Sequence, residues 1–227
     1  MPFSHVDNWI FDLDNTLYSG DANFFKQIDV KMTAFVSRFL DMPPVEARKV
    51  QKQYLLEYGT TLSGLMAVHN MDPEEFLNDV HDISLDVLDP DPALRPAIET
   101  LPGRKFIFTN GSQKHAKNVG DHLGIYDLFD GVFAIEDAGY VPKPKPAPYD
   151  MFIKEHDIEP KRAMMAEDSA RNLKIPFELG MKTLLITSQA DWSHEPEHAR
   201  PHTGENTPDF VHDHTGDLSA WLHGLEF

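Results

Sequence analysis

The sequence contains no cysteine, which excludes disulfides and cysteine-ligated metal sites. No apolar run approaches the roughly 20 residues of a membrane-spanning helix. The first residues lack the basic region and the long apolar region of a secretory signal peptide. We therefore expect a cytoplasmic protein without a membrane partner. Internal repeats and low-complexity tracts are absent too, so a repeat architecture is not expected.

Positive charge is scarce as well, with 20 lysines and arginines against 37 aspartates and glutamates, a formal net charge of -17. Such an acidic surface repels the phosphate backbone of DNA and RNA, so we expect no nucleic-acid polymer as a partner. A small phosphate ester can still bind where a cation, lysines or a helix N-terminus supply positive charge locally. The length of 227 residues suffices for one sizeable core, or for a core with a small second domain.

Short apolar runs that end in polar turn residues alternate with helical patterns along most of the chain. This alternation predicts βαβ units and a parallel sheet. The expected strands lie at residues 9–11, 106–108, 132–134, 163–166 and 183–186. Helices are expected at about 113–123, from the proline-rich loop 142–148 to about His156, and behind Ser169. Residues 188–208 show little periodicity and are expected to form a long loop.

Residues 18–90 carry helical patterns and no strand pattern. Five apolar residues spaced three and four apart predict one helix face: Phe25, Ile28, Met32, Phe35 and Phe39. Pro43 and Pro44 end this helix, and further helices are expected at about 45–58, 61–69 and 73–81. The proline-rich segment 88–96 is predicted to be a linker back to the sheet. The block is therefore an all-helical insertion after the first strand.

Open parallel sheets bind ligands at the carboxyl ends of their strands. Four polar clusters are predicted to reach this edge: Asp12/Asp14/Thr16, Thr109/Asn110, Lys143/Lys145 and Glu167/Asp168. Each alone has an ordinary explanation, because Asp-x-Asp is common in turns and a Thr-Asn or Glu-Asp pair often begins a helix. Their common position at one edge of the sheet favours a single functional site.

The residue types of these clusters indicate a particular chemistry. Crowded carboxylates raise each other's pKa values unless a cation lies among them. Oxygen ligands suit a hard ion such as Mg²⁺, which binds one or two carboxylates together with substrate phosphate. One carboxylate can form an aspartyl phosphate while a second, two residues along, transfers protons. A lysine and a hydroxyl stabilise charge on the transferring phosphoryl group.

Four segments carry a family resemblance: DLDNTLY from Asp12, FTNG from Phe108, KPKPAPY from Lys143 and AEDSARNL from Ala166. In this order they resemble the motifs of the haloacid dehalogenase superfamily, over nearly the whole chain. The resemblance implies a three-layer, Rossmann-like α/β core with a parallel sheet at residues 1–17 and 91–227. It also implies that residues 18–90 form a helical cap domain of the C1 type.

The same resemblance implies roles for the carboxylates. Asp12 is similar to the nucleophile and would also bind Mg²⁺. Asp14 is similar to the general acid and base, and its backbone carbonyl would contact the metal. Asp168 corresponds to a direct metal ligand, and Glu167 to a residue that acts on the metal through water. Asp14 also argues against dehalogenation, since true haloacid dehalogenases lack this second aspartate.

Substrate phosphate would be held by Thr109 and Asn110, with Thr16 and a lysine as further candidates. Lys143 and Lys145 both precede a proline, so both fit the lysine motif. The family pattern places an aromatic residue six positions after the lysine, which from Lys143 is Tyr149. We therefore favour Lys143 as the catalytic lysine, and Lys145 is then a solvated loop charge or a secondary phosphate contact.

The run DLDNTLY, the TNG and the helical insertion resemble the pyrimidine 5′-nucleotidase branch, which dephosphorylates nucleoside monophosphates such as UMP and CMP. Phe24, Tyr54 and Tyr58 are less constrained by helical spacing and are candidates for stacking on a base. Phe25, Phe35 and Phe39 are expected to be core residues instead.

Three alternatives stay open at this point. The four motifs serve a sugar-phosphate phosphatase or a phosphomutase equally well. A non-catalytic binding protein on the same fold predicts a damaged motif, and every motif residue is intact. The histidines of the polar C-terminal region offer a zinc site, although no helix signal orders them: His194, His198, His202, His212 and His214.

Overall fold

The structure is a computed structural model that describes residues 3–20, 24–189, 192, 200 and 202–226. Its centre is a six-stranded parallel sheet with the strand order β3-β2-β1-β4-β5-β6. The strands are β1 (Asn8–Phe11), β2 (Arg104–Phe108), β3 (Gly131–Phe133), β4 (Ala163–Glu167), β5 (Lys182–Ile186) and β6 (Asp213–Thr215). This sheet confirms the predicted Rossmann-like α/β fold.

Alternate residues of strands β1 to β5 enter two different hydrophobic cores, because successive side chains point to opposite faces of a sheet. Along β1, Trp9 and Phe11 lie in one core and Ile10 lies in the other. Along β2, Ile107 belongs to the first core and Phe106 to the second. Both faces of the sheet are therefore buried, as expected for a parallel sheet.

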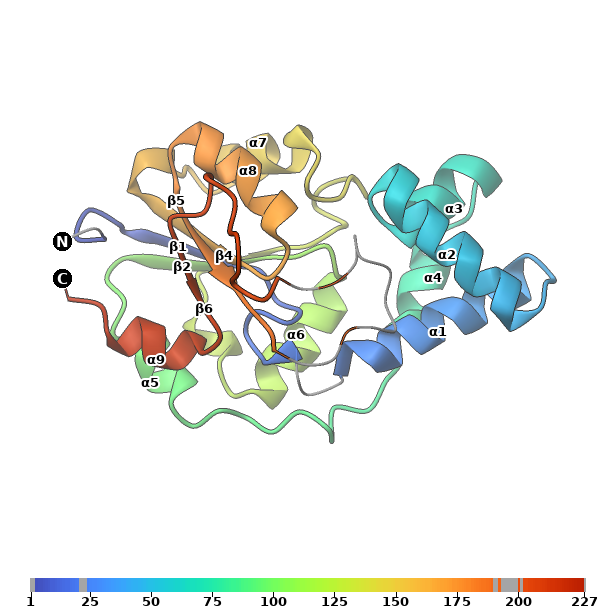
Figure 1. The fold of residues 1–227 in the computed structure, drawn as a ribbon, viewed down its shortest axis with the longest axis horizontal. Helices are drawn as coiled ribbons and strands as arrows, with labels where there is room; N and C mark the ends of the chain where they lie inside the picture. The colour runs from blue at the N-terminus through green and yellow to red at the C-terminus, as the bar shows by residue number, and fades with distance from the viewer. Residues whose placement is uncertain (1–2, 21–23, 190–191, 193–199, 201, 227) are drawn as a thin grey trace.

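Helices cover both faces and complete a three-layer arrangement (Figure 1). On one face lie α7 (Pro146–Glu155) and α8 (Ala170–Leu179), which supply Phe152 and Leu173 to the second core. On the other face lie α5 (Leu94–Glu99), α6 (Gln113–His122) and α9 (Leu218–His223). Short 3-10 turns at Tyr126–Leu128 and Pro160–Arg162 lead into β3 and β4.

Four helices between β1 and β2 form a bundle at one end of the molecule (Figure 1). They are α1 (Phe24–Phe39), α2 (Pro44–Tyr58), α3 (Thr61–His69) and α4 (Pro73–Val80), hereafter the helical bundle. Their starts follow ordinary capping chemistry: Pro44 occupies the first turn of α2, and Asp72 caps α4 by accepting from the Glu74 amide. All four agree with the predicted helices to within one residue. Among the described residues, no helix combines the length and the apolarity needed to cross a membrane.

Several expectations for individual residues were wrong. Phe39 is 37% exposed, and Phe25 is only half-buried. Phe24 is instead buried at 1% exposure. The helical spacing identified the apolar face of α1. It could not show which residues of that face lack a packing partner and are therefore exposed.

The segments around α5 and β6 also differ from the prediction. Helix α5 begins inside the predicted linker and contains Pro96, which its first turn tolerates because the amides there have no partner within the helix. Strand β6 has only three polar residues and therefore carries no apolar signal. Of the five histidines considered for zinc, His194 and His198 lie outside the described residues.

Candidate active site

Members of all four predicted clusters meet where β1 lies between β2 and β4, the point at which the strand order reverses. Asp12 directly follows β1, and its backbone amide donates to the Ala166 carbonyl of β4 (2.9 Å). Glu167 ends β4, and Thr109 follows β2. The sheet therefore brings residues more than 150 positions apart to one edge.

Lys143 is a fully buried charge at this edge, with 1% of its surface exposed. Its Nζ donates to Asp12 Oδ1 (2.8 Å), to Glu167 Oε1 (2.8 Å) and to the Phe108 carbonyl (2.6 Å). Burial alone would lower the pKa of this ammonium, but Asp12 and Glu167 outweigh burial and raise the pKa. Lys143 is therefore a permanent positive charge directly beside the carboxylate of Asp12.

Both oxygens of Glu167 are occupied by protein donors. Oε1 accepts from Lys143 and from Asn172 Nδ2 (2.6 Å), and Oε2 accepts from the Ser169 amide (2.8 Å). A carboxylate held at three points and 1% exposed is rigid. Its observed contacts orient Lys143, which adds a positioning function to the predicted action on a metal.

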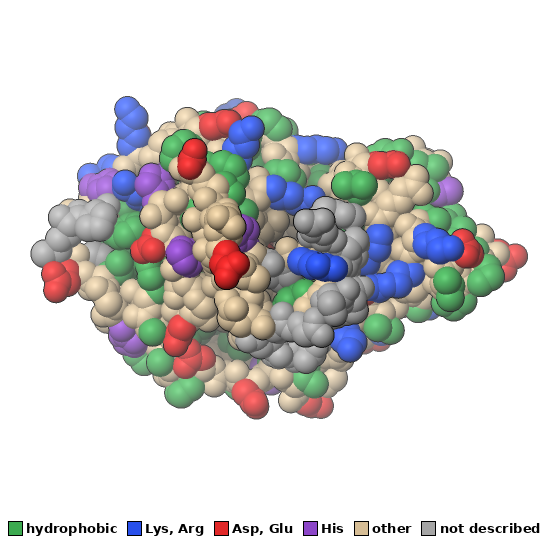
Figure 2. Space-filling view, in the orientation of Figure 1, with side chains coloured by type: hydrophobic (Ala, Val, Ile, Leu, Met, Phe, Trp, Pro, Cys, Tyr) green, Lys and Arg blue, Asp and Glu red, His purple; other side chains and the backbone are tan. Residues whose placement is uncertain are grey.

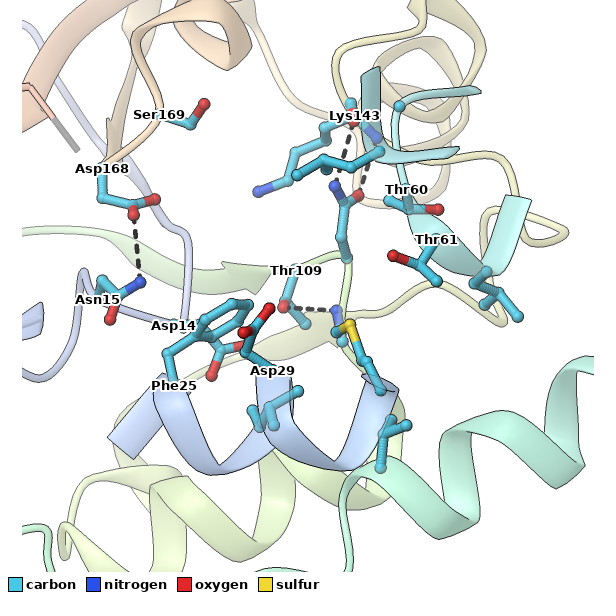
Figure 3. Close-up of a pocket in the computed structure, with 18 of the residues that line it drawn as sticks. Asp14, Asn15, Phe25, Asp29, Thr60, Thr61, Thr109, Lys143, Asp168 and Ser169 are labelled. Carbon is cyan, nitrogen blue, oxygen red and sulfur yellow. Dashed lines mark hydrogen bonds between the residues drawn. The ribbon is translucent and has the colours of Figure 1, made fainter. Parts of the chain in front are cut away.

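Three carboxylates, from Asp12, Glu167 and Asp168, each place one oxygen within 4.8 Å of the others. Burial raises the pKa of Asp12 to about 8, a rise that Lys143 only partly opposes. Burial and the neighbouring Glu167 raise the pKa of Asp168 as well. Carboxylates that resist ionisation together fit a divalent hard cation, which would offset their repulsion. The donor set is thus suited to Mg²⁺, held by Asp12 and Asp168, and Asn15 Nδ2 donates to Asp168 Oδ2 (3.3 Å, Figure 3).

The side chain of Asp14 is not part of this carboxylate group. Its Oδ1 accepts from Tyr18 Oη (2.6 Å) and from His115 Nε2 (2.8 Å). Burial would raise the pKa of Asp14, but His115 and Tyr18 together lower it below its usual range. Asp14 is therefore ionised and oriented by two donors.

The predicted phosphate-binding residues divide into two kinds. Thr109 Oγ1 accepts from the Gly111 amide (2.9 Å), which leaves its own hydrogen available to a phosphate oxygen. Asn110 pairs with the backbone of Lys143 instead: Oδ1 accepts from the amide (2.8 Å) and Nδ2 donates to the carbonyl (3.1 Å). The observed contacts of Asn110 thus hold the lysine loop in place.

The other two candidates lie outside the cavity described next. Thr16 is buried beneath the first loop, and its Oγ1 has no hydrogen-bond partner among the described residues. Lys145 is exposed at the start of α7. The structure therefore brings Lys143 to the carboxylates and leaves Lys145 facing solvent.

A cavity of about 280 Å³ lies between this edge and the helical bundle. Asp14, Thr109, Lys143 and Asp168 surround it on the sheet side, while Phe25 and Asp29 of α1 approach from the bundle (Figure 3). The basic residues that line it are Lys26, Lys52, Lys143, Arg171 and Arg200. Lysines and arginines also gather on the surface where the bundle meets the core (Figure 2). The cavity thus brings positive charge to the sheet edge of a strongly acidic protein, and five carboxylates share the same lining: Asp12, Asp14, Asp29, Glu167 and Asp168.

A buried polar cluster forms the bundle wall of the cavity. Asp29 Oδ1 accepts from Lys52 Nζ (2.6 Å) and Gln51 Nε2 (2.7 Å), and Asp29 Oδ2 pairs with Arg48. Burial would raise the pKa of Asp29, but Lys52 and Arg48 outweigh it and lower the pKa. Next to this cluster the wall is apolar, with Phe25, Met32 and Leu55 among its residues.

Sequence reasoning missed Tyr18, His115 and the Asp29 cluster. Ser112 caps α6 by accepting from the His115 amide, so His115 lies in the first turn of the helix that follows Thr109-Asn110. A polar side chain in the first turn behind a motif strand faces the ligand edge of the sheet. That position was a usable signal for His115, whereas the Asp29 cluster requires the packing of α1 against α2.

Comparison with known proteins gives the family. A family model described as haloacid dehalogenase-like hydrolase matches residues 6–175. The chain therefore belongs to the haloacid dehalogenase-like hydrolase family, and the superfamily resemblance of the motifs is confirmed. A curated relative, "Phosphate metabolism protein 8" of Saccharomyces cerevisiae, is 27% identical over 206 residues, which are 83% of this chain and 64% of the relative. The chain thus spans about two-thirds of that relative's length.

Solved structures with the same fold include both dehalogenases and phosphatases. A HAD phosphatase of Thermococcus onnurineus has a TM-score of 0.60 at 20% identity, covering 92% of this chain and 93% of that chain. A Bacillus subtilis HAD-hydrolase bound to magnesium, YfnB, has a TM-score of 0.61 at 15% identity, covering 98% of this chain and 99% of that chain. An L-2-haloacid dehalogenase of Xanthobacter autotrophicus has a TM-score of 0.56 at 19% identity, covering 97% of this chain and 100% of that chain. At these identities the likeness establishes the fold alone.

Proposed function

We propose that this protein is a Mg²⁺-dependent phosphomonoesterase that acts through a phospho-aspartate on Asp12, with pyrimidine nucleoside monophosphates such as UMP and CMP as substrates. The observation that carries the proposal is the pairing of two differently held aspartates. Asp12 lies against the Lys143 ammonium (2.8 Å), and Asp14, two residues on, is fixed by Tyr18 and His115. A nucleophile and a separate proton carrier are what ester cleavage needs.

Asp14 favours phosphate esters over haloacids for a chemical reason. A halide leaves as a stable anion and needs no proton, whereas an alkoxide leaves from phosphorus only with help from an acid. A buried carboxylate beside the nucleophile has no task in halide displacement. The lysines and arginines that line the cavity also suit a phosphorylated substrate.

In the proposed reaction, an Asp12 oxygen attacks phosphorus and the bond from phosphorus to the leaving oxygen breaks. Asp14, ionised in the free protein, receives a proton from the bound phosphate monoanion and passes it to that oxygen. It later takes one from the water that hydrolyses the acyl phosphate, which restores Asp12 and releases inorganic phosphate. Lys143 and the Thr109 hydroxyl stabilise the phosphoryl oxygens. A Mg²⁺ ion bound by Asp12 and Asp168 would supply further positive charge at this point.

The nucleoside part of the proposal rests on the helical bundle, which we propose acts as a cap over the cavity. An apolar wall next to the Asp29, Gln51 and Lys52 cluster offers a surface for a flat ring and hydrogen-bonding groups for its edge. A volume of about 280 Å³ lies at the lower limit of small-molecule sites, which are roughly 300–1,000 Å³.

The test is release of phosphate from UMP, CMP, purine nucleotides, sugar phosphates and p-nitrophenyl phosphate, each with Mg²⁺ and with excess chelator. We expect activity only with the metal, and the highest kcat/KM for the pyrimidine nucleotides. Release of chloride from L-2-chloropropionate, measured in parallel, is expected to be absent. A preference for sugar phosphates would reject the nucleotide assignment alone, and full activity in chelator would reject the metal.

A further inference from the structure

Asp14 is held by Tyr18, the last residue of the first motif segment, and by His115, which lies outside the four segments. Tyr18 Oη and His115 Nε2 both donate to the same oxygen, Oδ1, and neither contacts Oδ2. A β-carbon at Gly111 would lie 3.2 Å from Thr109 Oγ1 and 3.5 Å from Asp14 Oδ2, so Oδ2 lies on the side of the Thr109 hydroxyl. The two donors thus fix one carboxylate oxygen and leave the other facing the Thr109 side of the site.

His115 is in turn held by the helical bundle. The His81 ring, which follows α4, stacks on the His115 ring at 4.2 Å between centroids and an interplanar angle of 13°. The Phe24 ring, the first residue of α1, lies parallel to His115 at 6.1 Å. Phe24 also packs edge-on against Tyr18 at 5.2 Å. One aromatic residue of the bundle therefore contacts both donors to Asp14.

His81 fixes this arrangement to the start of α6. Its Nδ1 hydrogen-bonds with Ser112 Oγ (2.9 Å), the same oxygen that caps the His115 amide. Burial lowers the pKa of His81 to about 3, so its ring is neutral and adds no charge beside His115. With only 2% of its surface exposed, His115 has little freedom to leave Asp14.

We propose that His115 is the positioning residue of Asp14: with Tyr18 it fixes Oδ1 so that Oδ2 is presented to the leaving group, and the bundle residues Phe24 and His81 hold it in place. The proposal rests on the proposed function, in which Asp14 is the acid and base. It predicts that loss of the His115 donor damages proton transfer and spares nucleophilic attack by Asp12.

Leaving-group chemistry separates this role from a structural one. An alkyl ester such as UMP needs a proton on its leaving oxygen, whereas p-nitrophenyl phosphate leaves as a stable phenolate. His115→Phe keeps an aromatic ring for stacking and removes the donor. We expect its kcat on UMP to fall about tenfold to a hundredfold, a part of the full contribution of an acid-base group. Its first turnover of p-nitrophenyl phosphate should remain fast and be followed by a slow second step, giving a burst of phenolate.

Two variants complete the comparison. His115→Gln places an amide donor near the position of Nε2 and should recover part of the loss on UMP. His156→Phe changes a partly buried histidine that packs against Phe106 at a tilted angle, away from the site. This variant should leave the ratio of kcat on UMP to kcat on p-nitrophenyl phosphate unchanged. Thermal unfolding of each variant reports its folding, and His115→Met provides the same comparison if the Phe variant does not fold.

The outcomes are distinct. A selective loss on UMP with a phenolate burst, reduced in the Gln variant, supports the positioning role. A first turnover slowed equally on both substrates, or no loss on UMP, overturns it and makes His115 a structural residue. If wild type hydrolyses neither UMP nor any other alkyl phosphate, the proposed function itself fails, whatever the variants do.

Discussion

Lys143 illustrates how one residue serves both folding and chemistry. Its ammonium lies between the carboxylates of Asp12 and Glu167, and all three groups are nearly inaccessible to solvent. Charges buried in this way are stable only when they are paired and hydrogen-bonded. The lysine that stabilises a phosphoryl group during the reaction is thus also the counter-ion that allows two carboxylates to be buried beside it.

The two lysines of the KPKP segment therefore have different expected effects. Lys143→Ala should lower kcat by roughly a hundredfold or more, as for removal of a single donor at a developing charge. It should also destabilise the fold by about 3–5 kcal/mol, because two buried carboxylates lose their partner. Lys145→Ala is the matched control: this side chain is exposed, and its loss should change stability by less than about 0.5 kcal/mol. If the two variants have equally small effects on kcat and on the unfolding temperature, the phosphate-binding lysine lies elsewhere.

The motif residues could be located from the sequence because each follows a strand, and parallel strands end at one edge. The same logic could not separate Asn110 from Thr109, although their contacts differ: one holds the backbone of Lys143, and the other keeps a hydroxyl hydrogen for a ligand. The hydrogen-bond partner of a side chain depends on packing in three dimensions. The partners of Asp14 were missed for this reason, since His115 lies 101 positions away from it.

At the scale of elements, α1 has two different surroundings along one apolar stripe. Phe24 and Phe35 are buried in the core, while Phe25, Ile28 and Met32 line the cavity. Helical periodicity predicts which residues share a face of a helix, but a cavity is a place where packing is missing. The sequence therefore predicted the helix well and misassigned Phe25 as a core residue.

This difference makes α1 a test of the bundle as a specificity element. Phe25→Ala should change the ranking of substrates, with the pyrimidine nucleotides losing more kcat/KM than p-nitrophenyl phosphate, because a face that contacts the leaving group is lost. The control on the same helix is Phe39→Ala, whose ring is 37% exposed and does not line the cavity. If Phe25→Ala lowers kcat/KM by the same factor on every substrate, the bundle only covers the site.

For the molecule as a whole, the main electrostatic problem is an excess of negative charge. The net charge of -17 comes with a buried group of carboxylates at the sheet edge. Burial raises the pKa of Asp12 from 3.8 to about 8, and that of Asp168 well above its usual value. Without a metal, these groups favour the protonated form in the folded protein.

The sign of the pH dependence follows from this shift. A carboxyl whose pKa is higher in the folded than in the unfolded state contributes stability below about pH 4, and this contribution is lost as the pH rises towards about 8. The metal-free protein should therefore lose stability over that interval. A divalent cation binds the ionised carboxylates, so its affinity should increase over the same interval.

We therefore expect the increase in Tm caused by Mg²⁺, measured against chelator, to be small at about pH 5 and large at about pH 8. Ligand at a hundred times its Kd stabilises a folded protein by about 2.7 kcal/mol, which is a readily measured shift. Asp168→Asn should abolish the increment, because it removes a ligand from the carboxylate group. Asp29→Asn changes a buried carboxylate of the bundle and should retain the increment even if its baseline Tm is lower. If the increase in Tm caused by Mg²⁺ is independent of pH, or persists in Asp168→Asn, the metal binds away from the end of β4.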